Sequence, residues 1–476
     1  MVHSGEQSVH VVLVPYPSQG HINPVLQFGK RLAAHSGVRC TVAVTRFVVG
    51  STASPCRAGS VHVAVFSDGC DSGGPAELGG HRGPYFERLE AAGSESLDRL
   101  LREEAERAGR RQARMVVVYD AFMPWVPRLA RRHGAAACAA FLTQTCAVDV
   151  VYTHARAGRL ALPVRDGPPL HLPGLPAPLA VADVPTFLAA TDAHHPCMRQ
   201  LLTNQFTGLE TVDYVFVNSF HELEPQEAEY MAATWGAKTI GPTVPSAYLD
   251  NRLPDDASYG FQLHTPMTAE SRAWLDAQPA RSVVYASFGS IVAPGAEQMA
   301  EVAEGLYGSG NPFLWVVRAT ETGKLPEGFA SKVKEGKATA SRGLVVPWCP
   351  QLEVLAHRAV GCFVTHCGWN STVEALSAGV PMVAMPQWSD QTTNAKYIED
   401  VWRVGVRARR SDGGGGVVTK DEVERCVREV MTESGAMAEE YRRNAASWSA
   451  KARSAMSEGG SSDSNIAEFL RKIRLK

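Results

Sequence analysis

Short apolar runs alternate along the chain with segments of mixed polarity that have the composition of helices. The run VHVVLVPYP (9–17) is continuous, as expected of a strand that is buried on both faces of a sheet. Strands that alternate with helices predict a parallel α/β sheet. The strands predicted in this first series are 9–17, 39–46, 61–66, 113–120, 135–142 and 214–219.

The segment that follows the first predicted strand, SQGHINPVLQFGKRLAAHSG, has the pattern of a helix. Asn23 is suited to cap this helix, with Pro24 at its first position, and Gly37 is suited to end it. We therefore expect the helix to begin after Asn23 and to finish before Gly37.

The alternation breaks down between residues 242 and 270, where Pro, Asp and Tyr are frequent and no period is evident. We interpret this stretch as an interdomain linker. The sequence therefore predicts an α/β protein with two doubly wound domains that face each other across a cleft. The strands predicted in the second series are 282–288, 312–318, 343–348, 361–366 and 381–386.

We expect a first domain at residues 1–242, a linker at 243–270 and a second domain at 271–455. The tail, 456–476, has the pattern of an amphipathic helix, because its apolar residues recur at helical spacing. Their stripe requires a buried partner, and we expect the tail to pack back on the first domain. The residues of the stripe are Ile466, Phe469, Leu470 and Ile473.

Composition and charge are those of a soluble globular protein. Of the 476 residues, 45% are hydrophobic and 20% are charged, and the formal net charge is −2. So small a charge offers no basic field for nucleic acid or anionic membrane. The amino terminus lacks the features of a signal peptide, and no run approaches the ~20 apolar residues that span a bilayer. Ten widely spaced cysteines favour reduced thiols, and we expect a cytoplasmic protein.

The stretch FVTHCGWNSTVEALSAG (363–379) predicts a phosphate-binding corner, because a strand runs through a short loop into a helix. The start of a helix carries unsatisfied N–H groups and a partial positive charge, which favour phosphate. His366, Asn370 and Ser371 add side-chain donors at the same point, and Gly368 lets the backbone approach a ligand closely.

The same residues also have purely structural interpretations. Ser371 and Glu374 fit an S-x-x-E capping box, which needs no ligand. His366 is suited to the end of a strand and Trp369 to a core. The spacing of this segment alone leaves both interpretations open.

The longer segment WCPQLEVLAHRAVGCFVTHCGWNSTVEALSAGVPMVAMPQWSDQ (348–391) closely resembles the signature box of plant secondary-product glycosyltransferases, without a gap. These are the UDP-sugar-dependent family 1 enzymes of GT-B fold. The pieces PYPSQGHINP, VVYDAF, VNSFHELE, YASFGS, FLWVVR and EGGSSDSNIAEF are similar to the same family, so the resemblance covers nearly the whole chain. The sequence is most similar to the branch that glucosylates salicylate-, anthranilate- and indole-acetate-like acids.

The resemblance implies a donor-binding role for each matching position. Trp348 would stack on the uracil face, and the backbone of Cys349 would bind the edge of the base. Gln351 and Glu374 would meet the ribose. The diphosphate would be held by Ser290, His366, Asn370 and Ser371, and the sugar would face Trp369, Asp390 and Gln391.

Asp390 also has a structural interpretation, since it is suited to cap the helix QTTNAKYIEDVW. Gln391 ends the box where some members have histidine, and glutamine here is similar to glucose-using members. The resemblance therefore favours UDP-glucose as the co-substrate.

Two residues of the first domain are candidate catalytic residues. His21 follows the first predicted strand and Asp120 ends the fourth, and parallel strands bring such positions together. A histidine that is oriented by a carboxylate is an effective general base, although helix-start and helix-capping roles would place these residue types in the same positions. The family's base and its supporting aspartate fall on His21 and Asp120. We expect Ser18, His21 and the variable loops to contact the acceptor.

The implied reaction is an inverting transfer of glucose to a small aromatic acid or phenol, which yields a β-glucoside or a glucose ester. The same chemistry on terpenoid or other xenobiotic alcohols is an alternative. No D-x-D pair occurs in the chain, so we expect a metal-independent enzyme with no cofactor besides the co-substrate UDP-glucose.

Other classes of protein fit the sequence less well. A nicotinamide-dependent oxidoreductase would need a G-x-G-x-x-G fingerprint after the first strand, and PYPSQGHINP lacks it. A sugar-nucleotide binder without enzymatic activity would be expected to lose His21 or Asp120, and the chain keeps both. Nucleic-acid binding has no basic stripe to support it.

Overall fold

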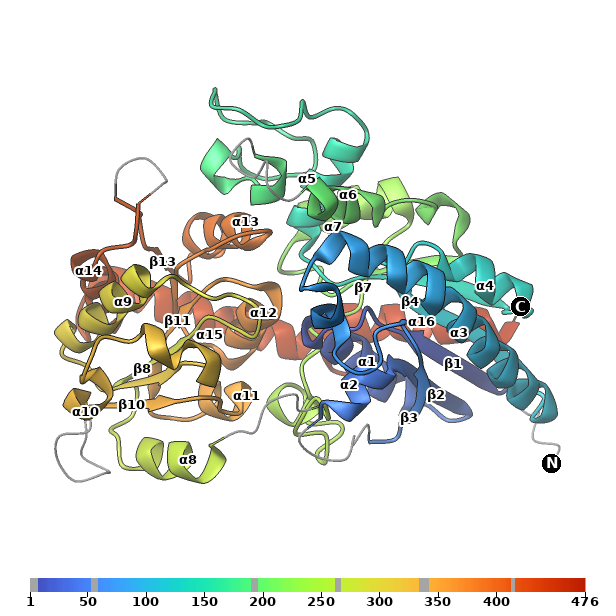
Figure 1. Cartoon of the computed structure of the whole chain (residues 1–476), viewed down its shortest axis with the longest axis horizontal. Coiled ribbons are helices and arrows are strands. Elements are labelled where there is room, and N and C mark those ends of the chain that lie inside the picture. The colour runs from blue at the N-terminus through green and yellow to red at the C-terminus, as the bar shows by residue number, and fades with distance from the viewer. Residues whose placement is uncertain are drawn as a thin grey trace.

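The computed structural model describes residues 7–52, 59–189, 196–261, 267–333, 342–411 and 416–475. The chain forms two α/β lobes that lie side by side (Figure 1). Each lobe is built on one parallel sheet with helices on both faces. The first sheet is complete by residue 239, and the second begins at residue 283. Residues 262–266 of the expected linker lie outside the described residues.

The sheet of the first lobe has the strand order β3-β2-β1-β4-β5-β6-β7, and its neighbouring strands pair in parallel. All six residues of β1 are buried, because helices cover both faces of the sheet and leave no side for polar residues. The strands are β1 (Val9–Val14), β2 (Val38–Thr45), β3 (His62–Phe66), β4 (Arg114–Asp120), β5 (Ala137–Leu142), β6 (Tyr214–Val217) and β7 (Lys238–Thr239).

The sheet of the second lobe has the order β10-β9-β8-β11-β12-β13 and is also parallel. Every strand that the sequence predicts in either lobe is present. The short strands β7 and β13 were not predicted. The strands of this lobe are β8 (Val283–Ser287), β9 (Phe313–Val316), β10 (Gly343–Val346), β11 (Val360–Thr365), β12 (Met382–Ala384) and β13 (Gly405–Arg407).

Helices connect the strands and cover the sheets. The first lobe contains α1 (Gln19–Ala33), α2 (Arg46–Gly50), α3 (Arg82–Arg110), α4 (Val126–Arg132), α5 (Cys146–Arg156), α6 (Pro196–Asn204) and α7 (Pro225–Trp235). Later in the chain follow α8 (Thr268–Asp276), α9 (Ala296–Gly308), α10 (Phe329–Val333), α11 (Gln351–Leu355), α12 (Trp369–Ala378), α13 (Gln391–Lys396), α14 (Lys420–Met431), α15 (Ala436–Met456) and α16 (Ser461–Leu475).

The expected start of the first helix was wrong. Helix α1 begins at Gln19 with Ser18 as its N-cap, so that Asn23 and Pro24 lie inside the helix. The proline has no N–H to donate to the Gly20 carbonyl, and this carbonyl accepts from Asn370 Nδ2 of the second lobe instead. The helix also ends at Ala33, before Gly37. The earlier start places His21 within the first turn of α1.

Both sheets reverse their strand order once. In the first sheet the order reverses between β1 and β4, where Val14 pairs with Tyr119. In the second sheet it reverses between β8 and β11, where Ser287 pairs with Thr365. At such a point the loops leave adjacent strands toward opposite faces, which opens a crevice at the carboxyl ends of the strands.

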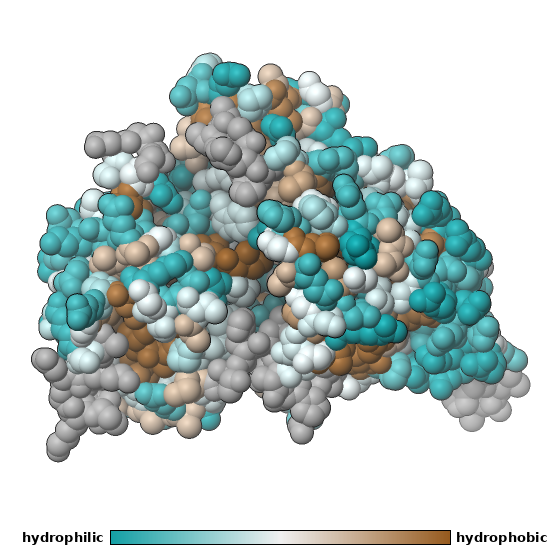
Figure 2. Space-filling view, viewed as in Figure 1, coloured by the Kyte–Doolittle hydropathy of each residue, from teal (hydrophilic) through white to brown (hydrophobic). Residues whose placement is uncertain are grey.

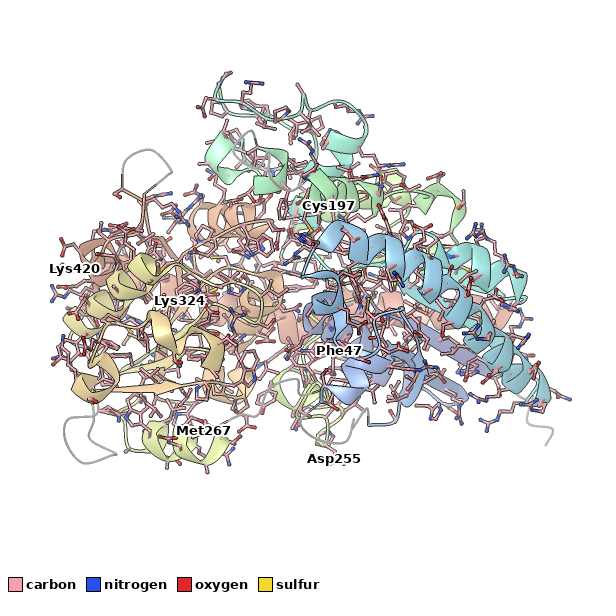
Figure 3. All side chains as sticks on the ribbon, viewed as in Figure 1. Phe47, Cys197, Asp255, Met267, Lys324 and Lys420 are labelled. Atoms are coloured by element: carbon pink, nitrogen blue, oxygen red, sulfur yellow. The ribbon has the colours of Figure 1, made fainter. Side chains whose placement is uncertain are left out.

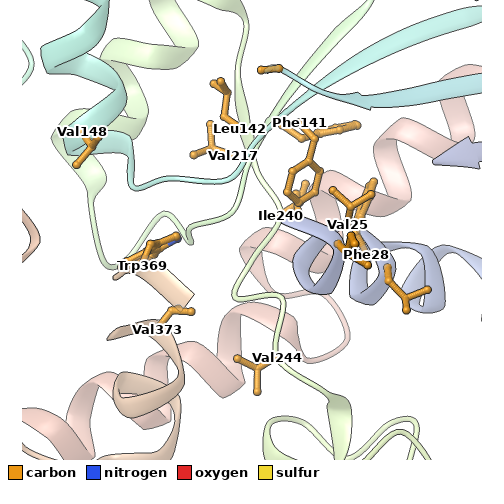
Figure 4. Close-up of a cluster of buried hydrophobic side chains, with 14 of the residues drawn as sticks. Val25, Phe28, Phe141, Leu142, Val148, Val217, Ile240, Val244, Trp369 and Val373 are labelled. Carbon is orange, nitrogen blue, oxygen red and sulfur yellow. The ribbon is translucent and has the colours of Figure 1, made fainter. Parts of the chain in front are cut away.

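One hydrophobic core joins the two lobes. Trp369 and Val373 of α12 lie in the same buried cluster as Phe141 of β5 and Val25 and Phe28 of α1 (Figure 4). A second cluster fills the far side of the second lobe and includes Trp315 of β9. Because apolar contacts continue from one lobe into the other, the lobes share part of their burial.

The carboxyl-terminal helix α16 packs against the sheet of the first lobe (Figure 1). The Phe469 ring makes edge contacts with Tyr214 and Phe216 of β6, at centroid distances of 5.0 and 5.1 Å. Near the start of the helix, Asn465 Nδ2 donates to the Thr239 carbonyl at 2.8 Å. The buried stripe comprises Ile466, Phe469, Leu470 and Ile473.

Two observations bear on the environment of the chain. Cysteines among the described residues are all free, and most of them are buried. None of the described helices is both long enough and apolar enough to cross a bilayer.

The docking of α16 generates a prediction about stability. Replacing Phe469, which is 2% exposed, with alanine removes an aromatic ring from the core and should lower the free energy of unfolding by about 3–5 kcal/mol. Urea unfolding followed by tryptophan fluorescence measures the effect. Leu475→Ala on the same helix is the control, since Leu475 is 74% exposed. Equal midpoints for the two variants would show that the helix does not stabilise the fold.

Candidate active site

A cavity of about 590 Å³ lies between the two lobes and is lined by residues of both. Figure 2 shows a hollow between the lobes with hydrophobic residues around it. Cys197, at the start of α6, lies above the space between the lobes (Figure 3). Met198, Leu201 and Leu202 of the same helix line the cavity.

The structure brings the predicted site residues together around this one cavity. Asp120 is the exception, because it lies behind His21 and is 1% exposed. The predicted residues that line the cavity are Ser18, His21, Ser290, Trp348, Cys349, Gln351, His366, Trp369, Asn370, Ser371, Glu374, Asp390 and Gln391.

His21 and Asp120 form a hydrogen-bonded pair at the reversal point of the first sheet. His21 Nδ1 lies 2.7 Å from Asp120 Oδ2, and Asp120 Oδ1 accepts from the Phe122 N–H at 3.0 Å. With Asp120 ionised, the ring donates from Nδ1 and leaves the Nε2 lone pair available. The rings of Tyr16 and Phe122 flank the imidazole, at centroid distances of 5.2 and 4.7 Å. This arrangement can accept a proton from a hydroxyl group in the cavity.

On the opposite wall, His366 follows β11 at the reversal point of the second sheet. Two glycines make room for its ring: a Cβ on Gly289 would lie 2.7 Å from His366 Cε1, and one on Gly368 would lie 2.5 Å from Nε2. Burial lowers the pKa of His366 to about 4, so the ring is neutral. A hydrogen bond between the ring and the backbone of Ser287 opposes this decrease.

Helix α12 begins beside His366, with Gly368 as its N-cap. The capping-box interpretation of Ser371 and Glu374 is wrong, because both residues lie inside the helix and no side chain caps its start. The first N–H groups of the helix have no intrahelical acceptors, and Gly368, Asn370 and Ser371 line the cavity there. The corner can therefore bind an anion through backbone and side-chain donors.

Glu374 is buried one turn further along α12. Its carboxylate accepts from Tyr259 Oη at 2.9 Å and from Gln351 Nε2 at 2.7 Å. Burial raises the pKa of Glu374 to about 7, and these two hydrogen bonds oppose the rise. Gln351 also donates to Ser371 Oγ at 3.0 Å and accepts from Tyr285 Oη at 3.1 Å. The carboxylate is thus held in a network at the wall of the cavity.

Two of the residues that are predicted to bind the sugar nucleotide also form hydrogen bonds between the lobes. Trp369 Nε1 donates to the Asn218 carbonyl at 2.7 Å, and Asn370 Nδ2 donates to the Gly20 carbonyl at 2.8 Å. Gly20 immediately precedes His21 in the chain. Both structural and ligand-binding interpretations of Trp369 therefore have a physical basis, since the ring is 4% exposed and still lines the cavity.

Asp390 and Gln391 lie at the start of α13. Asp390 Oδ2 accepts from Asn394 Nδ2 at 2.9 Å, and burial raises the Asp390 pKa to about 6. Asp390 occupies the N-cap position without a side-chain bond to the backbone of the helix. Gln391 Oε1 accepts from the N–H groups of Gln387 and Trp388, at 2.9 and 3.1 Å, which fixes the loop beside it.

The remaining predicted residues lie at the ends of strands and helices. Ser18 is the N-cap of α1, and its carbonyl accepts from His21 N–H. Ser290 lies in the loop after β8. In this loop the carbonyls of Ser290 and Val292 accept hydrogen bonds from the Arg318 guanidinium. Trp348 follows β10 and is half-buried. The Sγ atom of the adjacent Cys349 lies 3.5 Å from Tyr285 Oη.

Sequence patterns did not indicate several residues that line the cavity. They are Tyr16, Arg82, Tyr259, Tyr285 and Trp388. Tyr259 lies in the segment that was interpreted only as a linker, so no periodic signal marked it. Tyr285 lies on a buried strand, where its ring is indistinguishable in pattern from core residues.

Two Rossmann-like lobes with a cavity between them are the arrangement of the GT-B fold. The family model for UDP-glucoronosyl and UDP-glucosyl transferase matches residues 244–450. UDP-glucosyltransferase UGT13248 from Hordeum vulgare subsp. vulgare is 51% identical over 472 residues, which cover 98% of this chain and 95% of the relative. UDP-glycosyltransferase 79 from Oryza sativa subsp. japonica is 50% identical over 467 residues, with 97% and 96% coverage.

The crystal structure of Os79 from O. sativa in complex with UDP is similar with a TM-score of 0.87 and 48% identity. The match covers 97% of this chain and 100% of that one. The chain belongs to the plant family 1 UDP-glycosyltransferases. It is an enzyme that transfers a glycosyl group, and the predicted GT-B fold is confirmed.

The raised pKa of Glu374 leads us to expect pH-dependent binding of UDP. If Glu374 is the ribose ligand, as the family resemblance implies, ribose hydroxyls would donate to its ionised carboxylate, and binding would release a proton from a group whose pKa burial raises to about 7. From the linkage relation, UDP affinity should rise by about tenfold between about pH 6 and about pH 8. Isothermal titration calorimetry in buffers of different ionisation enthalpy measures both the affinity and the proton release.

The control is Glu374→Gln, which keeps the shape of the side chain but cannot titrate. The phosphate groups of UDP titrate equally in both experiments, so the difference between the two profiles belongs to Glu374. A pH profile that is the same in the variant and in the wild type would contradict the assignment.

Proposed function

We propose that the protein is an inverting UDP-glucose-dependent O-glucosyltransferase that acts on small aromatic acids or phenols. The observation that carries the proposal is the placement of the His21–Asp120 pair and the start of α12 on two walls of one cavity. They belong to different lobes and lie at the two reversal points. A nucleophile beside His21 would then face a diphosphate bound at α12.

On the donor side, we propose the roles that the family resemblance implies. The uracil would stack on Trp348 and meet the backbone of Cys349, and the ribose would bind Gln351 and Glu374. The start of α12 supports a diphosphate site, because its first N–H groups lack intrahelical acceptors and lie at the cavity wall beside the His366 ring. The diphosphate ligands would be Ser290, His366, Asn370 and Ser371, and the sugar would contact Trp369, Asp390 and Gln391.

The buried carboxylate of Asp390 supports a hexose contact, since it retains acceptor capacity beside its bond from Asn394. Glucose is the proposed sugar because the barley relative is named a UDP-glucosyltransferase and because the signature box ends in Gln391. The Gln391 oxygen is occupied by backbone donors, so its amide N–H₂ group is the part that would meet a sugar hydroxyl.

In the proposed reaction, His21 Nε2 takes the proton from the acceptor hydroxyl as the oxygen attacks the anomeric carbon. The bond from that carbon to the β-phosphate oxygen breaks, and UDP leaves from the opposite face, which inverts the centre. Asp120 holds the tautomer and stabilises the imidazolium. The developing charge on UDP would be stabilised by α12 and its neighbouring donors without a divalent ion.

The acceptor side of the cavity is aromatic and aliphatic, with residues such as Tyr16, Phe86, Phe122 and Phe187. Among the described residues that line the cavity, Arg82 is the one lysine or arginine. Its guanidinium lies 4.9 Å from the centroid of the Trp388 ring, which belongs to the other lobe. A flat apolar pocket with one cation supports an aromatic acceptor that carries an anionic group.

A terpenoid alcohol is the second candidate class of acceptor. A crystal structure of Os79 from O. sativa, which is 47% identical to this chain, contains U2F and trichothecene. The apolar lining suits such a ligand as well as an aromatic ring. The two classes differ in charge, which makes Arg82 the residue that distinguishes them.

Replacing His21 with alanine should lower kcat for a phenol acceptor by about 10²–10⁴-fold, because the general base is lost. For a carboxylate acceptor the loss should be smaller, since a carboxyl group with a pKa of about 4 is already ionised at neutral pH. UDP release from UDP-glucose, measured with EDTA present, gives the rates for both acceptors.

The matched control is His133→Ala, because His133 also pairs with a carboxylate, Asp98, at 3.0 Å but lies outside the cavity. Near-normal turnover of the phenol by His21→Ala would remove His21 from the proposed role. No release of UDP with any acceptor by the wild-type enzyme would overturn the proposed function.

Replacing Arg82 with methionine should raise KM for aromatic acids by about tenfold or more, because a charge-assisted hydrogen bond is lost. KM for neutral phenols and for terpenoid alcohols should change little. Steady-state kinetics with matched acceptors, with and without a carboxylate, measure the difference. Arg88→Met, on the exposed side of the same helix, is the control. Equal effects on acids and neutral alcohols would reject the preference for acids.

A further inference from the structure

Residues 246–261, which lie between β7 and α8, are held against helix α1 through buried ion pairs. Arg31 Nη1 donates to Asp250 Oδ2 at 2.7 Å, and Lys30 Nζ donates to Asp256 Oδ1 at 2.8 Å. Gln27 donates to the other oxygen of Asp256. The side chains of these ion pairs are at most 8% exposed. We name residues 246–261 the α1-bound strap.

The strap places Tyr259 at the donor wall of the cavity. Its hydroxyl donates to Glu374 Oε1 at 2.9 Å, although Glu374 belongs to α12 of the second lobe. Burial and the neighbouring Glu374 raise the pKa of Tyr259 well above its usual value. The phenol therefore stays protonated and acts as a hydrogen-bond donor. Ala257, Ser258, Gly260 and Phe261 of the strap line the same cavity.

The Glu374 carboxylate can accept about four hydrogen bonds, two at each oxygen. Tyr259 occupies one position at Oε1, and Gln351 occupies one at Oε2. Gln351 is itself held by Tyr285. With these partners among the described residues, one position is left at each oxygen, and the two together match a pair of neighbouring hydroxyl groups.

We propose that Tyr259 is a positioning residue for donor binding, which orients the Glu374 carboxylate so that each of its oxygens accepts from one hydroxyl of a ribose diol. The proposal rests on the proposed function, because it takes Glu374 as the ribose ligand. It adds a residue outside the signature box and assigns a task to the α1-bound strap. Helix α1 then carries His21 at its start and anchors a donor-site residue through its later turns.

The test is Tyr259→Phe, which removes the hydroxyl and keeps the ring. UDP affinity should fall by about tenfold, because without this hydrogen bond the Glu374 carboxylate is less well oriented toward the ribose and less ionised at neutral pH. The affinity for 2′-deoxy-UDP should fall less, because that ligand has only one of the two hydroxyls. The affinity for UDP divided by the affinity for 2′-deoxy-UDP should therefore fall by about threefold or more. Calorimetry with each nucleotide measures the ratio.

The pH profile supplies a readout that a purely structural tyrosine would not change. The Tyr259 hydrogen bond favours the ionised carboxylate, so its loss should move the midpoint of the UDP-affinity profile to higher pH. The other titratable groups that face this network are Tyr285, Cys349 and, beside Tyr259, Asp256. All three are kept in the variant, so the shift belongs to Glu374.

Two further variants complete the experiment. Tyr441→Phe removes a similar bond, from Tyr441 to Glu429 at 2.7 Å, far along the chain on α15, and should leave UDP affinity and its midpoint unchanged. Asp256→Asn weakens the anchoring of the strap to Lys30 and, like Tyr259→Phe, should lower the UDP affinity. The melting temperature of each variant shows that it is folded.

The outcomes separate this inference from the proposed function. Suppose that Glu374→Gln weakens UDP binding, while Tyr259→Phe changes neither the UDP affinity, nor the ratio of the UDP and 2′-deoxy-UDP affinities, nor the midpoint of the pH profile. The inference is then overturned and the proposed function stands. If Glu374→Gln and His366→Ala both leave UDP binding unchanged, the proposed donor site itself fails. A changed ratio together with a raised midpoint in Tyr259→Phe supports the inference.

Discussion

The reversal of strand order in each sheet is the constraint on which the site depends. β1 and β4 are neighbours at the reversal of the first sheet, and they place His21 and Asp120 within 2.7 Å although 99 residues separate them. β8 and β11 do the same in the second sheet, where Gly289 and His366 come into contact. Since loops diverge at such a point, each lobe offers a crevice there, and two crevices that face each other make one cavity.

A cavity between lobes is useful for catalysis only if the lobes keep a defined orientation. Hydrogen bonds that cross the interface supply this orientation, from Trp369 to Asn218, from Asn370 to Gly20 and from Trp402 Nε1 to the Leu223 carbonyl at 3.2 Å. The first two come from residues of the signature box. Its side chains therefore help to fix the distance between the two walls of the cavity as well as lining it, and a fixed distance between reacting groups favours in-line transfer.

Local pattern was sufficient for much of the fold, because buried parallel strands such as β1 and β11 are continuous apolar runs. β7 and β13 are only two and three residues long and leave no such signal. The start of α1 was missed because Asn23 and Pro24 form a plausible cap, while the real cap is Ser18. The box residues could be assigned by resemblance, but contacts between distant segments could not. Tyr259 is the clearest case, since its partner Glu374 is 115 residues away.

The electrostatics of the cavity bear on the kind of ligand that its polar residues would bind. Burial raises the pKa values of Glu374 and Asp390 to about 7 and about 6 and lowers that of His366 to about 4. All three shifts favour the neutral forms, because a buried charge without a partner is costly. Hydroxyl groups of a ribose and a hexose would stabilise the two carboxylates, and a diphosphate would favour proton donation by the histidine. A ligand that carries all three groups would supply a polar partner to each of these side chains at once, whereas a simple sugar or an isolated phosphate would supply only some of these partners.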